Sequence, residues 1–293
     1  MKIISALIPL LISASLFATA SDEKFAQADK LFQEGKYSEA AALFDDASLE
    51  TEDARKRIEA RYRSWDCLRK QRAKNALSSA ESLLYDESEL SNIRKIELIL
   101  YIASRSKKEK REKVLEFGLN LEGLDEKQRS RILLAAINSG GTWKNESFIN
   151  EILAMKEPDP CAKANALGHL ANLYLIAKGD PESALKYVKE ALEIKELGGK
   201  DRQFYTLVQA RACFALKQFK LAEKSYLSAI EISQQHNFQE TAYRELIRLY
   251  LFSGQKTKAE QLIKRAASDK KLKKRQQMVF SNLLAEIEKN QKE

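Results

Sequence analysis

The chain has 293 residues, of which 44% are hydrophobic and 31% are charged, and its formal net charge is +8. This balance is typical of a folded protein and excludes a disordered chain, which has too few apolar residues to form a core. Only ten glycines and four prolines are present, too few for the many turns of an all-β fold. The composition therefore predicts an all-α protein.

Residues 1–20 have the pattern of a secretory signal peptide. Lys2 precedes an apolar run from Ile3 to Phe17, and the small residues Ala18-Thr19-Ala20 end the segment. The run is shorter than the roughly 20 residues that span a bilayer, and Pro9 interrupts it. We expect cleavage after Ala20 and export, so that the protein is periplasmic or secreted. The alternative is an N-terminal membrane anchor.

The remainder of the chain reads as consecutive amphipathic helices separated by short turns. Apolar residues recur three and four positions apart, the spacing that places them on one side of a helix. The expected helices span residues 22–34, 37–49, 53–70, 73–85, 90–104, 107–121, 125–138 and 142–155, and then 162–178, 181–195, 201–217, 219–234, 239–253, 256–268 and 271–289. Pro158-Asp159-Pro160 is the candidate boundary between an N-terminal part, residues 21–157, and a C-terminal part, residues 158–293.

The second helix of several pairs begins with the same short motif, which places one small residue near the start of the helix and another seven positions later. It recurs at Gly35…Ala40…Ala47, Gly179…Ala184…Ala191, Phe219…Ala222…Ala229 and Gly254…Ala259…Ala266. Small residues let another helix pack closely, so each copy of the motif predicts one helix of a helical hairpin. The hairpins repeat roughly every 36–37 residues, which is typical of a helical solenoid.

The motif and the period of the hairpins resemble those of tetratricopeptide repeats. The resemblance covers residues 21–50 and 162–268, whereas residues 52–157 agree only in helix length and spacing. It implies a right-handed α-solenoid of stacked antiparallel helix pairs, with residues 271–289 as a C-terminal capping helix. It also implies a non-catalytic scaffold that binds a protein or peptide in a groove lined by the first helices of the pairs. The lysine and asparagine residues of the family's two-carboxylate clamp are not reproduced, so chaperone-tail binding is not implied.

Several positions on the first helices of the last two pairs are candidates for partner binding. They combine apolar side chains with guanidinium groups, which suits an acidic or C-terminal carboxylate segment. By repeat position these residues are Phe204, Leu207, Arg211, Arg244 and Arg248. The alternative is that the arginines cover the outer surface or pair with acidic residues of the chain, namely Glu223, Glu240 and Glu245.

The sequence contains no pattern that indicates catalysis, a metal site or a cofactor. His169 and His236 lie on different hairpins, and no metal-binding cysteine pair, phosphate loop or nucleophile elbow is present. The three cysteines are too few for a disulfide framework, and a single disulfide between Cys161 and Cys213 is the alternative to three free thiols. We therefore expect a protein that is not an enzyme, needs no cofactor and has no small-molecule substrate.

Two basic runs, residues 105–113 and 270–275, carry much of the excess positive charge. Such runs are usually solvated helix faces, but they also attract anionic partners. The alternatives to a peptide-binding scaffold are therefore an architectural subunit of a cell-envelope assembly and a binder of an anionic lipid or polysaccharide surface. Nucleic acid is not expected as a partner, because no aromatic residues are interleaved with the lysines to stack on bases.

Overall fold

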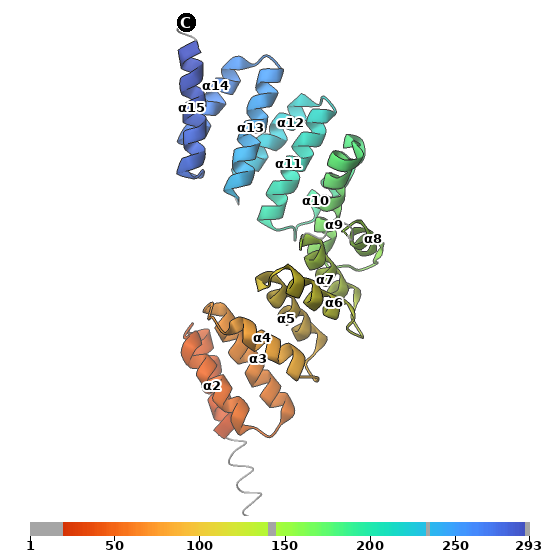
Figure 1. Cartoon of the computed structure of the whole chain (residues 1–293), viewed down its shortest axis with the longest axis vertical. Coiled ribbons are helices and arrows are strands. Elements are labelled where there is room, and N and C mark those ends of the chain that lie inside the picture. The colour runs from red at the N-terminus through yellow and green to blue at the C-terminus, as the bar shows by residue number, and fades with distance from the viewer. Residues whose placement is uncertain (1–19, 140–144, 233–234, 291–293) are drawn as a thin grey trace, which may run out of the picture. The chain divides into compact units, whose positions relative to one another are not determined.

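The structure of this chain is a computed structural model, and it describes residues 20–139, 145–232 and 235–290. The described residues form helices joined by short turns and contain no strand (Figure 1). Successive helices pack side by side in pairs, which confirms the all-α solenoid. Residues 1–19 of the candidate leader lie outside the described residues.

The first of two compact units comprises Met1–Leu124. Its described part begins with a helix over residues 20–33 and continues with α2 (Tyr37–Glu50), α3 (Ala54–Lys70), α4 (Ala76–Asp86), α5 (Asn92–Arg105) and α6 (Lys108–Leu119). From α2 onward, each helix of this unit packs against the next. The first helix joins the same core, because the ring of Phe25 meets the fully buried ring of Phe44 edge-on, with centroids 5.0 Å apart.

The second unit comprises Asp125–Glu293. Its helices are α7 (Glu126–Asn138), α8 (Asn145–Ala154), α9 (Pro160–Leu173), α10 (Pro181–Glu193), α11 (Gly199–Ala215), α12 (Phe219–Ile232), α13 (His236–Phe252), α14 (Lys256–Ser268) and α15 (Lys274–Asn290). Each helix packs against the next, and the first helices of the pairs, α7, α9, α11 and α13, also pack against one another. The second set of contacts produces a row made only of first helices.

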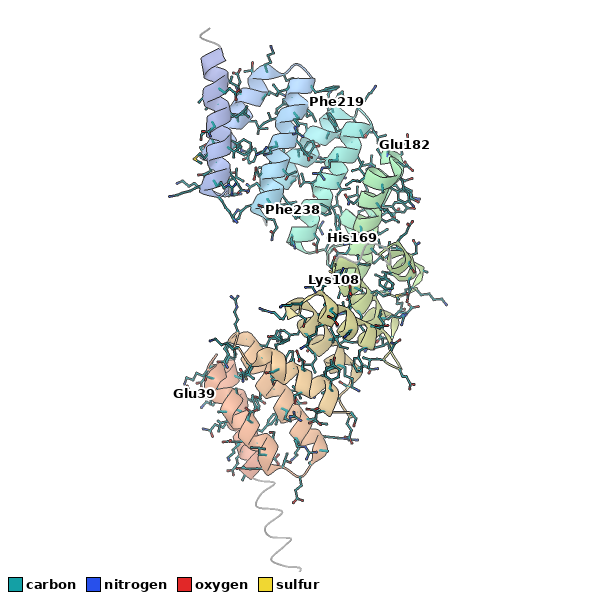
Figure 2. All side chains as sticks on the ribbon, viewed as in Figure 1. Glu39, Lys108, His169, Glu182, Phe219 and Phe238 are labelled. Atoms are coloured by element: carbon teal, nitrogen blue, oxygen red, sulfur yellow. The ribbon has the colours of Figure 1, made fainter. Side chains whose placement is uncertain are left out.

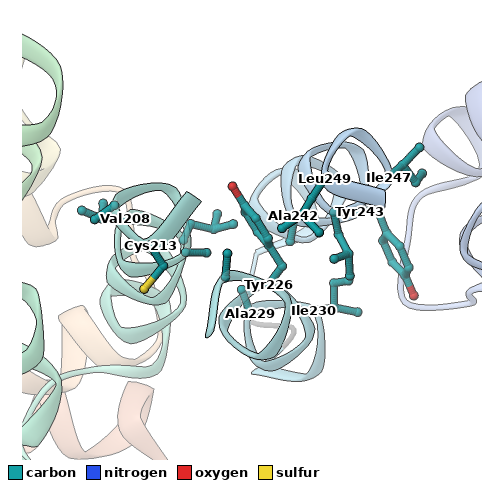
Figure 3. Packing of buried hydrophobic residues seen from close by; sticks show 14 of the residues in the cluster. Val208, Cys213, Tyr226, Ala229, Ile230, Ala242, Tyr243, Ile247 and Leu249 are labelled. Atoms are coloured by element: carbon teal, nitrogen blue, oxygen red, sulfur yellow. The ribbon is translucent and has the colours of Figure 1, made fainter. Parts of the chain in front are cut away.

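The small residues of the recurring motif lie in the core, as predicted. Ala184, Val188 and Ala191 of α10 are fully buried. The equivalent residues of the other second helices are at most 3% exposed: Ala40, Phe44, Ala47, Ala222, Tyr226, Ala229, Ala259, Ile263 and Ala266. Figure 3 shows Tyr226 reaching from α12 into the space between α11 and α13. One apolar face on each second helix therefore accounts for the stacking.

The turn before α10 shows how the sequence sets a helix boundary. Gly179 has a φ of 65°, a left-handed conformation that glycine adopts without strain. The carboxylate of Asp180 then caps the helix by accepting a hydrogen bond from the backbone N–H of Ser183 at 3.0 Å. Pro181 occupies the first turn, where its missing N–H leaves no helical bond unmade.

Two features differ in detail from the sequence-based expectations. The helix expected over 162–178 is α-helical only to Leu173 and continues as a π-helix over Tyr174–Lys178. The segment Pro158-Asp159-Pro160 lies inside the second unit, where Asp159 caps α9 and Pro160 occupies its first turn. Because proline is favoured in the first turn of a helix, this segment marks the start of α9.

Candidate functional site

The candidate partner-binding residues lie on α11 and α13, two first helices that pack against each other. The rings of Phe204 on α11 and Phe238 on α13 lie with centroids 5.3 Å apart and planes at 33°. Both rings are half-buried, and Phe238 is labelled near the start of α13 in Figure 2. The pair offers apolar contact area at the surface. We call the surface formed by the following residues the first-helix face: Phe204, Arg211, Phe238, Arg244, Glu245 and Arg248.

Arg211 lies two turns after Phe204 on the same side of α11, and it is already paired within the chain. Its Nη2 lies 2.6 Å from Oε1 of Glu245 on α13, and its Nε lies 3.0 Å from Oε2. The two side chains are 32% and 19% exposed, so water only partly screens the pair. Burial and the adjacent Glu245 carboxylate raise the pKa of Tyr226, whose side chain lies beside the pair. The alternative interpretation, in which Arg211 pairs with Glu245, is therefore confirmed.

The two arginines of α13 differ in their surroundings. Arg244 pairs with Glu240 one turn earlier, with Nε 2.9 Å from Oε1, and Glu240 also accepts a hydrogen bond from Gln276 of α15 at 2.8 Å. Arg248 is exposed and forms no ion pair with any residue that the structure describes. Among the three predicted arginines, Arg248 is therefore the one whose guanidinium is available to a partner.

Leu207 does not reach the surface. It is 1% exposed and belongs to the core of the second unit. The prediction that it contacts a partner is wrong, because α11 packs against α9, α10, α12 and α13 and Leu207 lies on a side of α11 that these helices cover. The structure thus brings Phe204 and Arg211 to the surface beside α13 and places Leu207 inside.

The first unit carries its own polar contacts between first helices, and these were not predicted. Lys56 Nζ lies 2.6 Å from the carboxylate of Asp22. The other contacts of this kind are Arg63 with Asp29, Arg94 with Glu59 and Tyr62 with Glu97. The partners are 34 or 35 residues apart in the chain. For the three ion pairs, the signal in the sequence is an acidic and a basic residue separated by about one repeat on successive first helices.

The two basic runs differ in how far the chain itself neutralises them. In residues 105–113, the guanidinium of Arg111 donates to the carbonyls of Ala103 and Ser106, while lysines pair with carboxylates in Lys110–Glu81 and Lys113–Glu109. In residues 270–275, five exposed cations form no ion pair within the described ranges: Lys270, Lys271, Lys273, Lys274 and Arg275. The second run is therefore the more strongly positive surface.

His169 and the three cysteines lie where they pack against other residues of the second unit or of the core. His169 of α9 packs against Tyr205 with ring centroids 6.1 Å apart, and its Nε2 lies 3.1 Å from Oδ1 of Asn138. Burial lowers the pKa of His169. All three cysteines are free thiols, so Cys161 and Cys213 are not joined. Within the described ranges, no three His, Cys, Asp or Glu side chains gather as a metal site would require.

None of the helices in the described part of the chain is long and apolar enough to cross a membrane. This finding applies to residues 20–139, 145–232 and 235–290 and leaves the leader segment aside.

Comparison with known proteins supports the fold. Residues 164–196, which span most of α9 and all of α10, match the family model of the tetratricopeptide repeat. The apo form of the quorum sensor NprR from B. thuringiensis is similar in structure, with a TM-score of 0.60 and 14% identity over 84% of this chain and 74% of that one. The C-terminal part of a TPR repeat-containing protein from Cytophaga hutchinsonii gives a TM-score of 0.55 and 16% identity over 86% and 97% of the two chains. At these identities the likeness shows the fold alone. No curated protein sequence matches the chain.

Proposed function

We propose that this tetratricopeptide-repeat protein is a non-catalytic scaffold that binds a segment of another protein on the first-helix face of its second unit. A solenoid of such repeats fits protein–protein interaction in general. The observation that carries the finer proposal is the guanidinium of Arg248, which is exposed on α13 and has no carboxylate partner among the described residues. An unpaired guanidinium on a row of first helices is a suitable group for recognising a carboxylate.

The proposed partner segment is extended and combines an acidic group with an apolar side chain. A carboxylate would bind Arg248, and an apolar side chain would contact the rings of Phe204 and Phe238. Arg248 lies ten residues after Phe238 on α13, which corresponds to about 15 Å at 1.5 Å per residue. That distance equals about four or five residues of extended chain. The acidic and apolar residues of the partner are therefore expected at this spacing, and the acidic group is either a side chain or a terminal carboxylate.

The other two arginines contribute less to recognition. Arg211 and Arg244 are already paired with Glu245 and Glu240. A partner carboxylate would have to displace these intrachain carboxylates, at the cost of bonds already made. Their aliphatic stems still offer contact area to the segment.

Charge reversal at Arg248 tests the proposal. The full chain is tagged and used to capture its partner from cells that express it. Arg248→Glu is expected to reduce recovery of that partner roughly tenfold, because it removes a charged hydrogen bond and adds like-charge repulsion. Lys264→Glu is the matched control, since Lys264 is exposed on the second helix α14. Equal recovery by the two variants would contradict a role for the first-helix face.

A second candidate function uses the basic run 270–275, either in a cell-envelope assembly or on an anionic lipid or polysaccharide surface. Five exposed cations without an acidic partner among the described residues favour it. Replacing all five with glutamine should then abolish binding of the full chain to phosphatidylglycerol vesicles, or its retention in an envelope complex. Because exposed charges are screened over about 8–10 Å at ordinary ionic strength, raised salt should release a surface binder. Retention in a large complex at high salt would instead indicate an architectural subunit.

We also propose that the chain is exported and that the mature protein begins at Ser21. In the folded unit the Ser21 hydroxyl donates a hydrogen bond to the carbonyl of Ala47 at 2.9 Å, and Ser21 is 4% exposed. Cleavage after Ala20 retains this side-chain bond. N-terminal sequencing of protein recovered from the periplasm or the medium should read Ser21 first. An intact Met1 terminus would contradict cleavage and support the alternative of a membrane anchor.

A further inference from the structure

A pocket of about 480 Å³ lies between α10, α11 and α12. Residues of a helix are about 100° apart, so two residues that are two positions apart lie on nearly opposite sides. Thr206 and Cys213, which line the pocket, are each two positions after Phe204 and Arg211. The pocket is therefore on the opposite side of α11 from the first-helix face, and it does not depend on the proposed partner site.

Two small residues of this pocket stand where the next repeat has tyrosines. Counted from the alanine that follows the opening of each second helix, Thr206 and Cys213 occupy the positions that Tyr243 and Tyr250 occupy one repeat later. On α13 these tyrosines are 0% and 6% exposed, and the pocket at the corresponding place, lined in part by Gln239, Arg265 and Asp269, is smaller, at about 320 Å³. On α11 a hydroxyl and a thiol replace two aromatic rings, and the pocket is the larger of the two.

The pocket is lined by cations from three helices. Lys189 of α10 and Lys224 of α12 are exposed, and neither forms an ion pair with a described residue. Arg202 of α11 is held in place, because its guanidinium donates to the carbonyls of Leu192 at 2.7 Å and Ile194 at 2.8 Å. No acidic side chain from the described part of the chain lines the pocket. Its electrostatic potential therefore favours an anion.

Apolar and hydroxyl side chains form most of the rest of the lining, among them Leu192, Thr206, Leu221, Ser225 and Ile232. Burial raises the pKa of the Cys213 thiol, and the ammonium of Lys189 opposes that shift. The positive charge of Lys189 thus acts close to the apolar part of the pocket. A ligand that suits both parts needs an apolar body and an anionic head.

We propose that this pocket binds a small amphiphilic anion, an aromatic or short aliphatic group that carries one carboxylate, sulfonate or phosphate. The apolar body occupies the space beside Thr206 and Cys213, and the anionic head lies between Lys189 and Lys224. The volume falls within the range of about 300–1,000 Å³ that small-molecule sites have. The sequence-based expectation included no small-molecule substrate, and this site adds a small ligand on a surface separate from the first-helix face.

The probe for this site is 8-anilinonaphthalene-1-sulfonate, an aromatic monoanion that becomes fluorescent in apolar surroundings, and it is titrated into the folded full chain. The wild type should show one saturable site. Thr206→Tyr/Cys213→Tyr reproduces the side chains of the next repeat and should abolish saturable binding. Lys189→Gln/Lys224→Gln should weaken binding roughly fivefold, because it removes two charges at the anionic head.

The matched control is Lys186→Gln/Lys220→Gln, which removes two exposed lysines of the same helices α10 and α12 that do not line the pocket. It should leave the affinity within about twofold of the wild type, because exposed charges outside the site are screened. Equal losses in the two lysine pairs, or unchanged affinity after the tyrosine substitutions, would overturn the proposal. If the tyrosine variant does not fold, the comparison of the lysine pairs decides. Neutral Nile red should not depend on Lys189 and Lys224, and an equal dependence would refute recognition of the anionic head.

Discussion

Replacing Gly168 of α9 with alanine should destabilise the second unit. A Cβ at this position would lie 2.3 Å from Cζ of Tyr205 on α11, whereas carbon atoms normally approach to about 3.5 Å. The ring has little room to move, because Tyr205 is 1% exposed and its hydroxyl lies 3.1 Å from Oδ1 of Asn165. Overpacking of this kind costs about 1–3 kcal/mol, and alanine in a helix returns up to about 1 kcal/mol relative to glycine. We expect a net loss of about 1–2 kcal/mol in the free energy of unfolding.

The assay is urea unfolding of the full chain followed by far-ultraviolet circular dichroism. The decisive comparison is the same substitution in a Tyr205→Ala background, where the ring is gone. There, Gly168→Ala should be neutral or stabilise by up to about 1 kcal/mol, since only the helix preference remains. An equal cost in both backgrounds, or a gain in the wild-type background, would refute a direct contact between position 168 and the Tyr205 ring.

Further predictions concern the charged groups of the second unit. Arg211→Met and Glu245→Gln should each lower the free energy of unfolding by about 1–2 kcal/mol, because each leaves a partly shielded group without its partner, and the double variant should cost less than the sum. Strictly additive costs would contradict this pairing. Burial lowers the pKa of His169 in the folded state, so as pH falls below about 6.5 the unfolded chain takes up this proton first and stability decreases. His169→Gln should flatten the change in melting temperature between about pH 7 and pH 5.5. The same change in melting temperature in wild type and His169→Gln would contradict a lowered pKa of His169.

The helices and their buried faces could be predicted from the sequence. The helix expected over 256–268 has those bounds in the structure, as α14. Ala184 and Ala191 are buried as their spacing indicated. These features depend on residues three, four and seven positions apart, which share one side of a helix wherever that helix packs. Local spacing therefore determines which face of each helix enters the core.

Contacts between successive first helices could not be predicted in the same way. Repeat position makes Arg211 equivalent to Arg248, yet the structure pairs Arg211 with Glu245, 34 residues further on. The register of two packed helices depends on their crossing angle and on the side chains between them, which a repeat length does not determine. For the same reason the burial of Leu207 follows from the four helices around α11 and is not visible in its own sequence.

The central claim, that the first-helix face binds the partner, is tested most directly by site-specific crosslinking. A photoreactive benzoylphenylalanine is placed at Phe238 on the first-helix face or, as the control, at Lys264 on α14. We predict that the captured partner crosslinks at position 238 and not at position 264, and that Arg248→Glu removes the crosslink at 238. Crosslinking at 264 alone, or a crosslink at 238 that persists with Arg248→Glu, would contradict the proposed recognition by this face.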